Sequence, residues 1–318
     1  QRSLAENILG SLASFSELPK LREKARKEAL EKTSILFCKS FAPGEIPSSE
    51  ISLLSRLSLV QLLFAGADNV PFREIPEKAL VASNAGGFAE PLAEHVLALA
   101  LALGKKLMPL HNRMREGVFD SSEESLFFCG KVCGIIGYGG NGRAIGKLMK
   151  GLGMRVEGIN RTGKPEAFCD VMGTWKNFHE MLPRWDVVVL TLPLTEKTRS
   201  IIGEEELQLM RKNAIFINVG RGALVEQGAL YEHLRRFPQF LAGIDTWWAE
   251  PVHSGGFALE YPFLELPNLM ASPHRADHVP EMSVYPMRKA LENITAHLRG
   301  EPLRGVLRRE EYLAVPGA

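Results

Sequence analysis

From residue 131 onward, short apolar runs alternate with segments whose apolar residues are spaced three or four apart. The runs are rich in Val, Ile and Phe, as strands are, and lie at 131–139, 155–160, 186–193, 214–220, 240–247 and 269–274. The spaced segments predict helices at 140–153, 179–185, 204–210 and 223–237. Because the strands are apolar throughout, both faces of their sheet must be covered. The alternation therefore predicts a doubly wound α/β domain with a parallel sheet.

The rest of the chain has a sparser pattern of the same kind. Strands are expected at 33–38, 59–66 and 78–84, and helices at 4–12, 20–32, about 91–107 and 280–300. A length of 318 residues fits two domains. We expect residues 98–274 to form one domain, and 1–97 together with 275–318 to form the other, a substrate domain.

The charge balance narrows the classes of partner. There are 38 Lys and Arg against 37 Asp and Glu, a formal net charge of +1. A chain this balanced has no global field, so we expect neither nucleic acid nor an anionic membrane as a partner. The most apolar helical run, 95–104, is about half the length of a bilayer span and is flanked by charges, which indicates a buried helix.

Cysteine usage indicates a reducing compartment. Cys38, Cys129, Cys133 and Cys169 form no CxxC pair, and no His or Cys pair stands at a matching distance for zinc. Free thiols in the cytoplasm are favoured over disulfides or a metal site. The first ten residues also lack the charged, apolar and small-residue order of a signal peptide.

A glycine pattern opens the second domain. Gly137, Gly139 and Gly142 have G-x-G-x-x-G spacing after a predicted strand and at the start of a predicted helix. Such glycines permit a tight turn, a close approach of backbone to a pyrophosphate and close helix packing, while the helix N-terminus supplies amides. We expect a dinucleotide cradle built from these glycines with Gly140 and Asn141.

The next strand ends without the acid that usually accepts hydrogen bonds from the adenosine ribose. Asn160, Arg161 and Thr162 stand there instead. A carboxylate would repel a 2′-phosphate, whereas a guanidinium suits one in charge and geometry. The stretch predicts a preference for NADP(H). The alternative is that Arg161 is a solvated residue stacking on adenine and that NAD(H) is accepted.

Three later strand ends carry groups that suit a 2-keto acid. Arg221, Glu250 and His274 follow strands of one parallel sheet, whose carboxyl ends face the ligand crevice. Arg221 can bind a carboxylate bidentately, and His274 can protonate a carbonyl oxygen as hydride arrives. Glu250 beside the imidazole would raise the pKa of His274.

Several motifs follow one another along nearly the whole chain. They are FAGADN at 64–69, SNAGGFAEPLAEHVLAL at 83–99, GYGGNG at 137–142, LPLTEKT at 192–198, NVGRG at 218–222, GIDTWWAEP at 243–251 and SPH at 272–274. Together and in this order they resemble the D-isomer-specific 2-hydroxyacid dehydrogenase family. The resemblance implies two Rossmann-like or flavodoxin-like domains with a cleft between them. It also implies a homodimer formed through the helix around 91–107.

The resemblance assigns roles to individual residues. Arg221 would orient the substrate carboxylate with help from the backbone amides of Ala65 and Gly66, and His274 would transfer the proton with Glu250 as its partner. At the nicotinamide, Asp245 would bind the carboxamide, and Val219 and Gly220 would line the ring. Pro193 and Thr198 would contact the dinucleotide elsewhere.

Some assignments stay open. Lys39 and Ser40 follow a strand and could contact a distal anionic group of the substrate, although a solvated loop is favoured. Trp247 and Trp248 stand where smaller residues are common, and a packing role is favoured over capping the substrate. His95 is expected to be a satisfied core or interface residue.

We therefore expect an oxidoreductase acting on glyoxylate, hydroxypyruvate, 3-phosphoglycerate or a related acid. Two alternatives are kept: a dinucleotide-sensing protein of the corepressor type, and a formate- or phosphite-type dehydrogenase on the same fold.

Overall fold

The computed structural model describes residues 2–42, 44–251 and 255–313. The chain divides into two compact units, Gln1–Phe88 with Val279–Ala318, and Ala89–His278. The first boundary lies nine residues before the predicted one, and the second lies four residues after it. Each unit is built around a parallel sheet, so the predicted α/β class is confirmed. Among the described residues, no helix combines the length and apolar character needed to cross a membrane.

The unit Ala89–His278 contains a seven-stranded parallel sheet in the order β10-β9-β8-β7-β4-β5-β6. The order reverses beside β4, where doubly wound sheets bind their ligands. β6 escaped prediction because it is short and only partly buried. The strands are β4 Val132–Ile136, β5 Arg155–Ile159, β6 Val171–Gly173, β7 Val187–Leu190, β8 Ile215–Asn218, β9 Leu241–Ile244 and β10 Leu269–Ala271.

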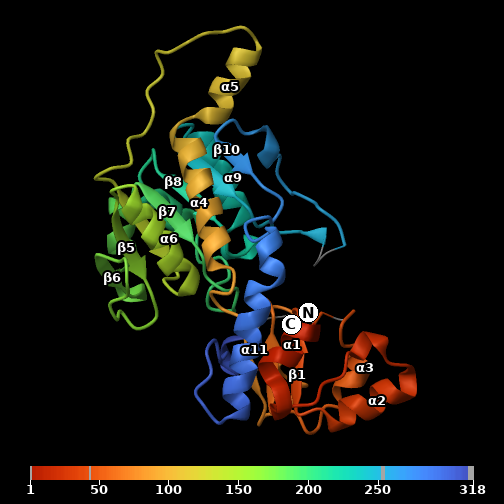
Figure 1. Cartoon of the computed structure of the whole chain (residues 1–318). Helices are drawn as coiled ribbons and strands as arrows, with labels where there is room; N and C mark the ends of the chain where they lie inside the picture. The colour runs from red at the N-terminus through yellow and green to blue at the C-terminus, as the bar shows by residue number, and fades with distance from the viewer. Residues whose placement is uncertain (1, 43, 252–254, 314–318) are drawn as a thin grey trace. The chain divides into compact units, whose positions relative to one another are not determined.

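Both faces of this sheet are covered, as the apolar strands predict. Along β7, Val187 and Val189 join one core cluster with α4 and α6, while Val188 and Leu190 join another with α7, α8 and α9. Figure 1 shows α4 and α6 side by side over the strands. The helices span Ala89–Gly104 (α4), Gly140–Gly151 (α6), Phe178–Met181 (α7), Glu204–Leu209 (α8) and Gln227–Arg236 (α9).

The apolar helix ends earlier than the sequence predicts. α4 stops at Gly104, whose absent side chain leaves room for the Phe128 ring: a Cβ there would lie 2.6 Å from it. Lys106 then takes a left-handed conformation (φ 54°) and a separate helix, α5, runs over Leu107–Arg115. α5 has no buried residue, so its sequence lacks the apolar periodicity from which a helix could be predicted.

The other unit contains a three-stranded parallel sheet in the order β1-β2-β3, formed by Ile35–Cys38, Leu59–Leu62 and Leu80–Ala82. Helices α2 (Glu23–Lys32) and α3 (Ser48–Ile51) contribute to the core on one face. α1 (Arg2–Leu9) and α11 (Tyr285–Leu298) cover the other. α11 is tied to β2 by a buried hydrogen bond of 2.6 Å from Asn293 Nδ2 to Gln61 Oε1. The predicted final helix is thus shorter, and a 3₁₀ turn, Pro280–Ser283, precedes it.

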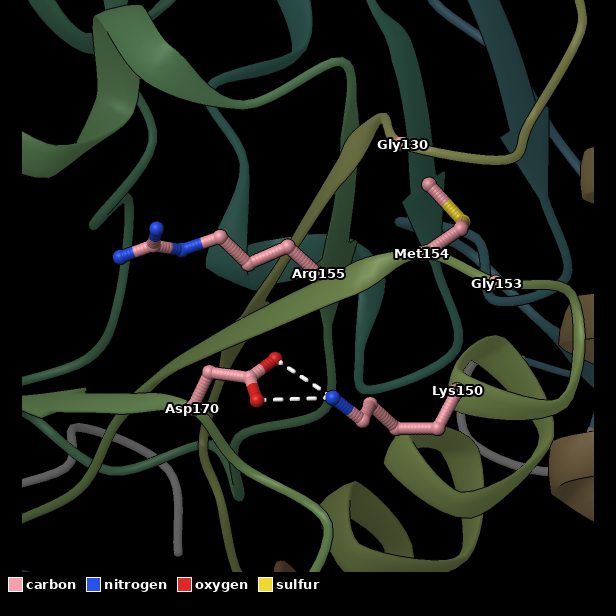
Figure 2. A pocket seen from close by; sticks show the side chains of 6 residues that line it. All are labelled: Gly130, Lys150, Gly153, Met154, Arg155 and Asp170. Carbon is pink, nitrogen blue, oxygen red and sulfur yellow. Dashed lines mark hydrogen bonds and ion pairs between the residues drawn. The ribbon is translucent and has the colours of Figure 1, made fainter.

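A shallow pocket of about 490 Å³ lies at the amino-terminal end of β5. Figure 2 shows Lys150 reaching over to Asp170, with Nζ–Oδ distances of 2.7 and 2.9 Å. The ammonium charge is therefore already compensated. The predicted site residues follow the carboxyl ends of the strands, so this pocket lies at the opposite edge of the sheet.

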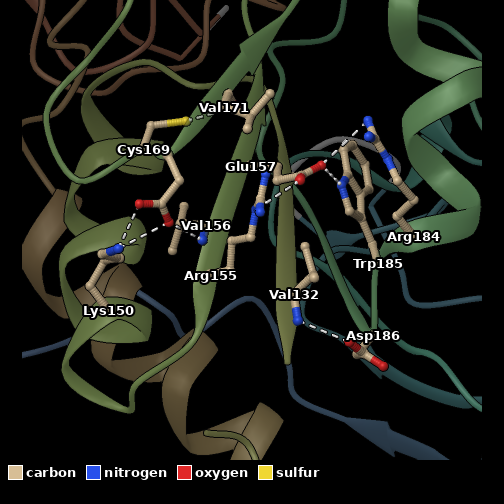
Figure 3. Close-up of polar contacts among 11 residues, drawn as sticks. Val132, Lys150, Arg155, Val156, Glu157, Cys169, Val171, Arg184, Trp185 and Asp186 are labelled. Carbon is tan, nitrogen blue, oxygen red and sulfur yellow. Dashed lines mark hydrogen bonds and ion pairs between the residues drawn. The ribbon is translucent and has the colours of Figure 1, made fainter. Parts of the chain in front are cut away.

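The seven-stranded sheet also carries a buried carboxylate on β5. Glu157 on β5 is 2% exposed and accepts a 3.0 Å hydrogen bond from Trp185 Nε1, with Arg155 and Arg184 nearby (Figure 3). The indole lies directly on Gly134 of β4, where a Cβ would be 1.8 Å from the ring. The strand sequence therefore needs a glycine at 134 for the tryptophan to reach Glu157.

Candidate active site

All the site residues predicted in the unit Ala89–His278 follow the carboxyl ends of its strands. The loops after β4, β5, β7, β8, β9 and β10 carry them. Because every neighbouring strand pair is parallel, these loops share one edge of the sheet.

The glycine loop has the geometry that its spacing predicts. Gly137 has φ +100°, a conformation that L side chains rarely adopt, and a Cβ on Gly142 would lie 3.0 Å from Gly137 O. A Cβ on Gly139 would meet nothing within 4 Å, so its exposed backbone is open to a ligand, and a side chain would fill that approach. α6 begins at the next residue and directs its first amides there. The loop therefore fits a pyrophosphate.

Tyr138, the variable residue between the first two glycines, has a structural task that sequence analysis missed. Its buried ring lies against Gly158, where a Cβ would be 2.5 Å from it, and its hydroxyl donates to Ala167 O at 2.9 Å. Burial raises the pKa of Tyr138 above its ordinary value. The residue links the glycine loop to the segment after β5, which carries Arg161.

Asn160 shapes the turn after β5. Its Oδ1 accepts hydrogen bonds from Thr162 N (3.0 Å) and Gly163 N (2.6 Å), and its Nδ2 donates to Lys164 O (3.1 Å). Arg161 and Thr162 are exposed at the tip of this turn. The amide side chain of Asn160 is therefore engaged within the turn, at whose tip Arg161 is exposed.

The turn after β7 lies beside the glycine loop. Thr198 Oγ1 accepts from Thr195 N and donates to Pro193 O, both at 2.8 Å, which closes the turn. Thr191 Oγ1 donates to Gly137 O at 3.1 Å. The turn that carries Pro193 and Thr198 is therefore tied to the glycine loop, at the point where the strand order reverses.

The imidazole of His274 is paired with Glu250. The distance from His274 Nδ1 to Glu250 Oε2 is 2.7 Å, and Glu250 Oε1 accepts from Trp247 N at 2.7 Å. Glu250 is 7% exposed, whereas the His274 side chain is 38% exposed. The pKa of His274 is raised, chiefly by the hydrogen bond to Glu250 and also by its charge, against the opposing effects of burial and of Arg221.

Arg221 follows β8 and lies near enough to act electrostatically on His274. Asn218 holds its turn, with Nδ2 donating to Arg221 O (2.9 Å) and Oδ1 accepting from Gly220 N (3.0 Å). A Cβ on Gly222 would lie 2.2 Å from the main-chain carbon of Trp247, so the backbones of the Arg221 loop and the Glu250 loop lie directly against each other. The structure brings the predicted guanidinium, carboxylate and imidazole together.

Asp245 lies beneath the turn that carries His274. It is 1% exposed and accepts hydrogen bonds from Arg275 N (2.9 Å) and Ala276 N (3.1 Å), while its main-chain oxygen accepts from His274 N (2.8 Å). His274 itself has φ +50°, a strained conformation for a residue with a side chain. These bonds hold that conformation.

The environment keeps Asp245 ionised. Burial alone would raise its pKa, but hydrogen bonds from His95 and Ser272 and from the backbone of Arg275 outweigh burial and lower the pKa to about 2. His95 Nε2 lies 3.0 Å from Ser272 Oγ and 3.4 Å from Asp245 Oδ1. His95 is thus part of the support of the His274 turn, a role that its position on an apolar helix does not reveal.

Both tryptophans pack, as favoured from the sequence. Trp247 is buried and its Nε1 donates to Ser272 O at 2.9 Å, which joins the Glu250 loop to the His274 turn. Trp248 donates to Val225 O at 2.7 Å and stacks on Phe263 with ring centroids 5.2 Å apart.

The remaining predicted residues lie in the other unit. Ala65 and Gly66 are half-buried in the loop after β2, and Lys39 and Ser40 follow β1. Among the described residues, no group of three or more His, Cys, Asp or Glu side chains is arranged to hold a metal ion.

Comparisons with known proteins agree with the motifs. A family model described as "D-isomer specific 2-hydroxyacid dehydrogenase, NAD binding domain" matches residues 97–276. Glyoxylate reductase of Thermococcus litoralis is 31% identical over 77% of this chain and 75% of its own length. D-3-phosphoglycerate dehydrogenase of Methanocaldococcus jannaschii is 28% identical over 96% of this chain and 58% of its own. A solved structure from Pyrobaculum aerophilum, provisionally described as a formate dehydrogenase, is 27% identical, with a TM-score of 0.80 over 97% of this chain and 96% of its own.

Proposed function

The chain belongs to the D-isomer specific 2-hydroxyacid dehydrogenase family, and on this basis we propose that it reduces a small 2-keto acid to a D-2-hydroxy acid. NADP(H) is the preferred cofactor, with NAD(H) as the alternative. The observation that carries the proposal is the 2.7 Å pair of His274 and Glu250 beside Arg221, on the sheet edge that also carries the glycine loop.

Each side chain has a separate task in this proposal. Arg221 binds the substrate carboxylate through its planar fork of donors, together with the amides of Ala65 and Gly66. His274, kept protonated by Glu250, gives its proton to the carbonyl oxygen and recovers it in the reverse direction. Because Nδ1 is engaged with Glu250, Nε2 is the nitrogen that serves the substrate.

The cofactor is held by the loops described above. The pyrophosphate lies on the glycine loop, that is on Gly137, Gly139, Gly140, Asn141 and Gly142. Val219, Gly220 and Asp245 serve the nicotinamide end, and Pro193 and Thr198 the middle of the molecule. When bound, the nicotinamide supplies the hydride. Asp245 has a second task, since its carboxylate also orders the His274 turn.

Arg161 carries the proposed preference for NADP(H). It is exposed on a turn that Asn160 organises, and no carboxylate stands at the end of β5 to repel a 2′-phosphate. Replacing Arg161 with Ala should weaken NADPH binding at least tenfold and NADH binding little, because only the former loses a charge-assisted contact. Equal loss for both nucleotides would contradict the assignment.

A homodimer in the cytoplasm completes the proposal. The resemblance implies that the helix around 91–107 forms the interface, and on α4 the side chains of Leu97 and Leu101 are only partly buried. Large exposed apolar side chains continue on α5 and in the segment that follows it: Leu107, Met108, Met114, Val118, Phe119 and Phe127. A second copy of the chain would cover them. The cysteines Cys38, Cys129, Cys133 and Cys169 are free thiols, which supports a reducing compartment.

A formate-type dehydrogenase is the second candidate, favoured by the likeness to the Pyrobaculum aerophilum structure. Formate has no carbonyl oxygen that needs a proton, so that reaction would leave the His274–Glu250 pair without its acid role. The pair therefore favours a keto acid.

The test is a panel of 2-keto acids with NADPH and NADH, followed by the loss of reduced-nucleotide absorbance, with formate and NADP⁺ or NAD⁺ in parallel. We expect turnover of glyoxylate or hydroxypyruvate. Nucleotide binding without turnover of any acid would instead favour a dinucleotide-sensing protein, and formate oxidation alone would favour the second candidate.

A further inference from the structure

The loop after β1 is folded around a carboxylate. Glu45 Oε1 accepts a hydrogen bond from Lys39 N at 2.7 Å, and its Oε2 accepts from Ser40 N at 3.0 Å and from Ala42 N at 3.3 Å. Phe41, between these donors, has φ +61° and a ring that is 2% exposed in the core. Three backbone N–H groups therefore converge on one point at the carboxyl end of a parallel strand.

Concave sets of backbone N–H groups bind anions, and in this protein the anion belongs to the chain itself. The nearby cation Arg26 does not neutralise it: Arg26 donates to the main-chain oxygen of Glu45 and forms its ion pair with Glu50, at 2.7 Å. Within the described part of the chain, the Glu45 carboxylate takes part in no ion pair. The loop therefore presents a half-buried negative charge, and its backbone N–H groups already donate to the Glu45 carboxylate.

This loop adjoins the one proposed to hold the substrate carboxylate. β1 and β2 are parallel neighbours, with Cys38 opposite Leu62. Beyond them, Leu63 N donates to Cys38 O at 2.8 Å and Phe64 N donates to Lys39 O at 3.0 Å. Ala65 and Gly66 follow immediately, so the two loops share one edge of the three-stranded sheet.

We propose that Glu45 sets the substrate class by excluding acids that carry a second negative group, and thus that the exposed ammonium of Lys39 on the same loop does not receive such a group. The inference rests on the proposed function. A keto acid bound at Ala65 and Gly66 that has a phosphate or a second carboxylate would meet the charge of Glu45, and the amides of Lys39 and Ser40 that could have received the anion are taken. The substrates are then small 2-keto acids with a neutral end, such as glyoxylate and hydroxypyruvate.

Hydroxypyruvate and phosphohydroxypyruvate form a matched pair for the test, because they differ only by the phosphate. The ratio of kcat/KM for the two acids with NADPH is measured for the wild type, for Glu45→Gln and for Glu77→Gln. Glutamine keeps the size of residue 45 and one acceptor oxygen. Glu77 is an exposed carboxylate of the same unit, so its variant matches the change in charge.

We expect the wild type to prefer hydroxypyruvate. Glu45→Gln should shift the ratio roughly tenfold toward the phosphorylated acid, the scale of one partly screened charge pair, with Glu77→Gln unchanged. Wild-type preference for phosphohydroxypyruvate, or the same ratio in all three proteins, would overturn the inference while leaving the proposed function intact.

Binding of inorganic phosphate tests the same idea without turnover. Isothermal titration should give tighter binding to Glu45→Gln than to the wild type or Glu77→Gln, and equal affinities would count against Glu45. If no keto acid is reduced by any of the proteins, the proposed function fails, and the phosphate titration still decides the role of the carboxylate.

Discussion

Two loops of this protein use the same device and differ in what surrounds it. In each, a carboxylate beside a strand end accepts hydrogen bonds from nearby backbone amides: Asp245 for the turn after β10, and Glu45 for the loop after β1. Asp245 is almost fully buried and receives further donors from His95 and Ser272. Glu45 is half exposed and has backbone donors only.

Each loop also contains a residue in the left-handed region, and the two residues point to different tasks. His274 (φ 50°) is more than a third exposed at the side chain, whereas the Phe41 ring (φ 61°) is buried. In the first loop the buried carboxylate supports an exposed functional side chain. In the second a buried side chain anchors the loop, and the carboxylate itself is presented. The same backbone device thus positions an imidazole in one case and a carboxylate charge in the other.

The largest expected effect comes from removing the functional side chain of the first loop. His274→Gln should lower kcat by about 10²-fold or more, because it removes the general acid. The dissociation constant for NADPH should stay near the wild-type value. His278→Gln, an exposed histidine four residues along, is the control. A kcat within threefold of wild type would end the assignment of His274 as the proton donor.

Asp245→Asn should have the next largest effect, a loss of folding stability. The substitution keeps the shape of the side chain but leaves one backbone amide of the turn without an acceptor. Because the folded-state pKa of about 2 lies below the ordinary value of 3.8, ionised Asp245 stabilises the fold at pH values above 3.8. That contribution, roughly 2 kcal/mol, is lost as the pH falls toward 2. Urea unfolding of both proteins between pH 7 and pH 3 measures it. If the difference in the free energy of unfolding between the wild type and Asp245→Asn does not shrink at acid pH, this account of Asp245 is contradicted.

Glu45→Gln should cost less in stability. The variant loses one of two acceptor oxygens in a half-exposed loop where water can replace it, so the free energy of unfolding should fall by about 1 kcal/mol at pH 7. A loss larger than that of Asp245→Asn would show that exposure does not separate the two loops as described.

The periodic elements could be predicted because a buried face requires apolar residues at a regular spacing along the sequence. The apolar strands around Val187–Leu190 and Ile215–Asn218 needed only their composition. β6 and α5 could not be predicted, because one is three residues long and partly buried and the other has no buried face. The division of the helix near Lys106 depends on a single left-handed residue.

The side chains of the candidate site could be named from the sequence, but the residues that hold them in place could not. Arg221, Glu250 and His274 stand after strands whose ends must meet, so their proximity follows from topology. The roles of His95, Ser272 and Trp247 depend on contacts across 25 to 177 residues of sequence, which no local pattern encodes. Glu45 was missed because its partners are backbone amides, which are the same for every residue type.

The central claim, that Glu250 keeps His274 protonated for the reduction, is tested most directly by the pH dependence of kcat/KM for glyoxylate in the wild type and in Glu250→Gln. The pKa of His274 is raised, so the wild-type rate should be high below that pKa and fall as the pH rises through it. In Glu250→Gln the fall should begin at a clearly lower pH, because the hydrogen bond to a charged partner is gone. A fall at the same pH in both proteins would contradict the account.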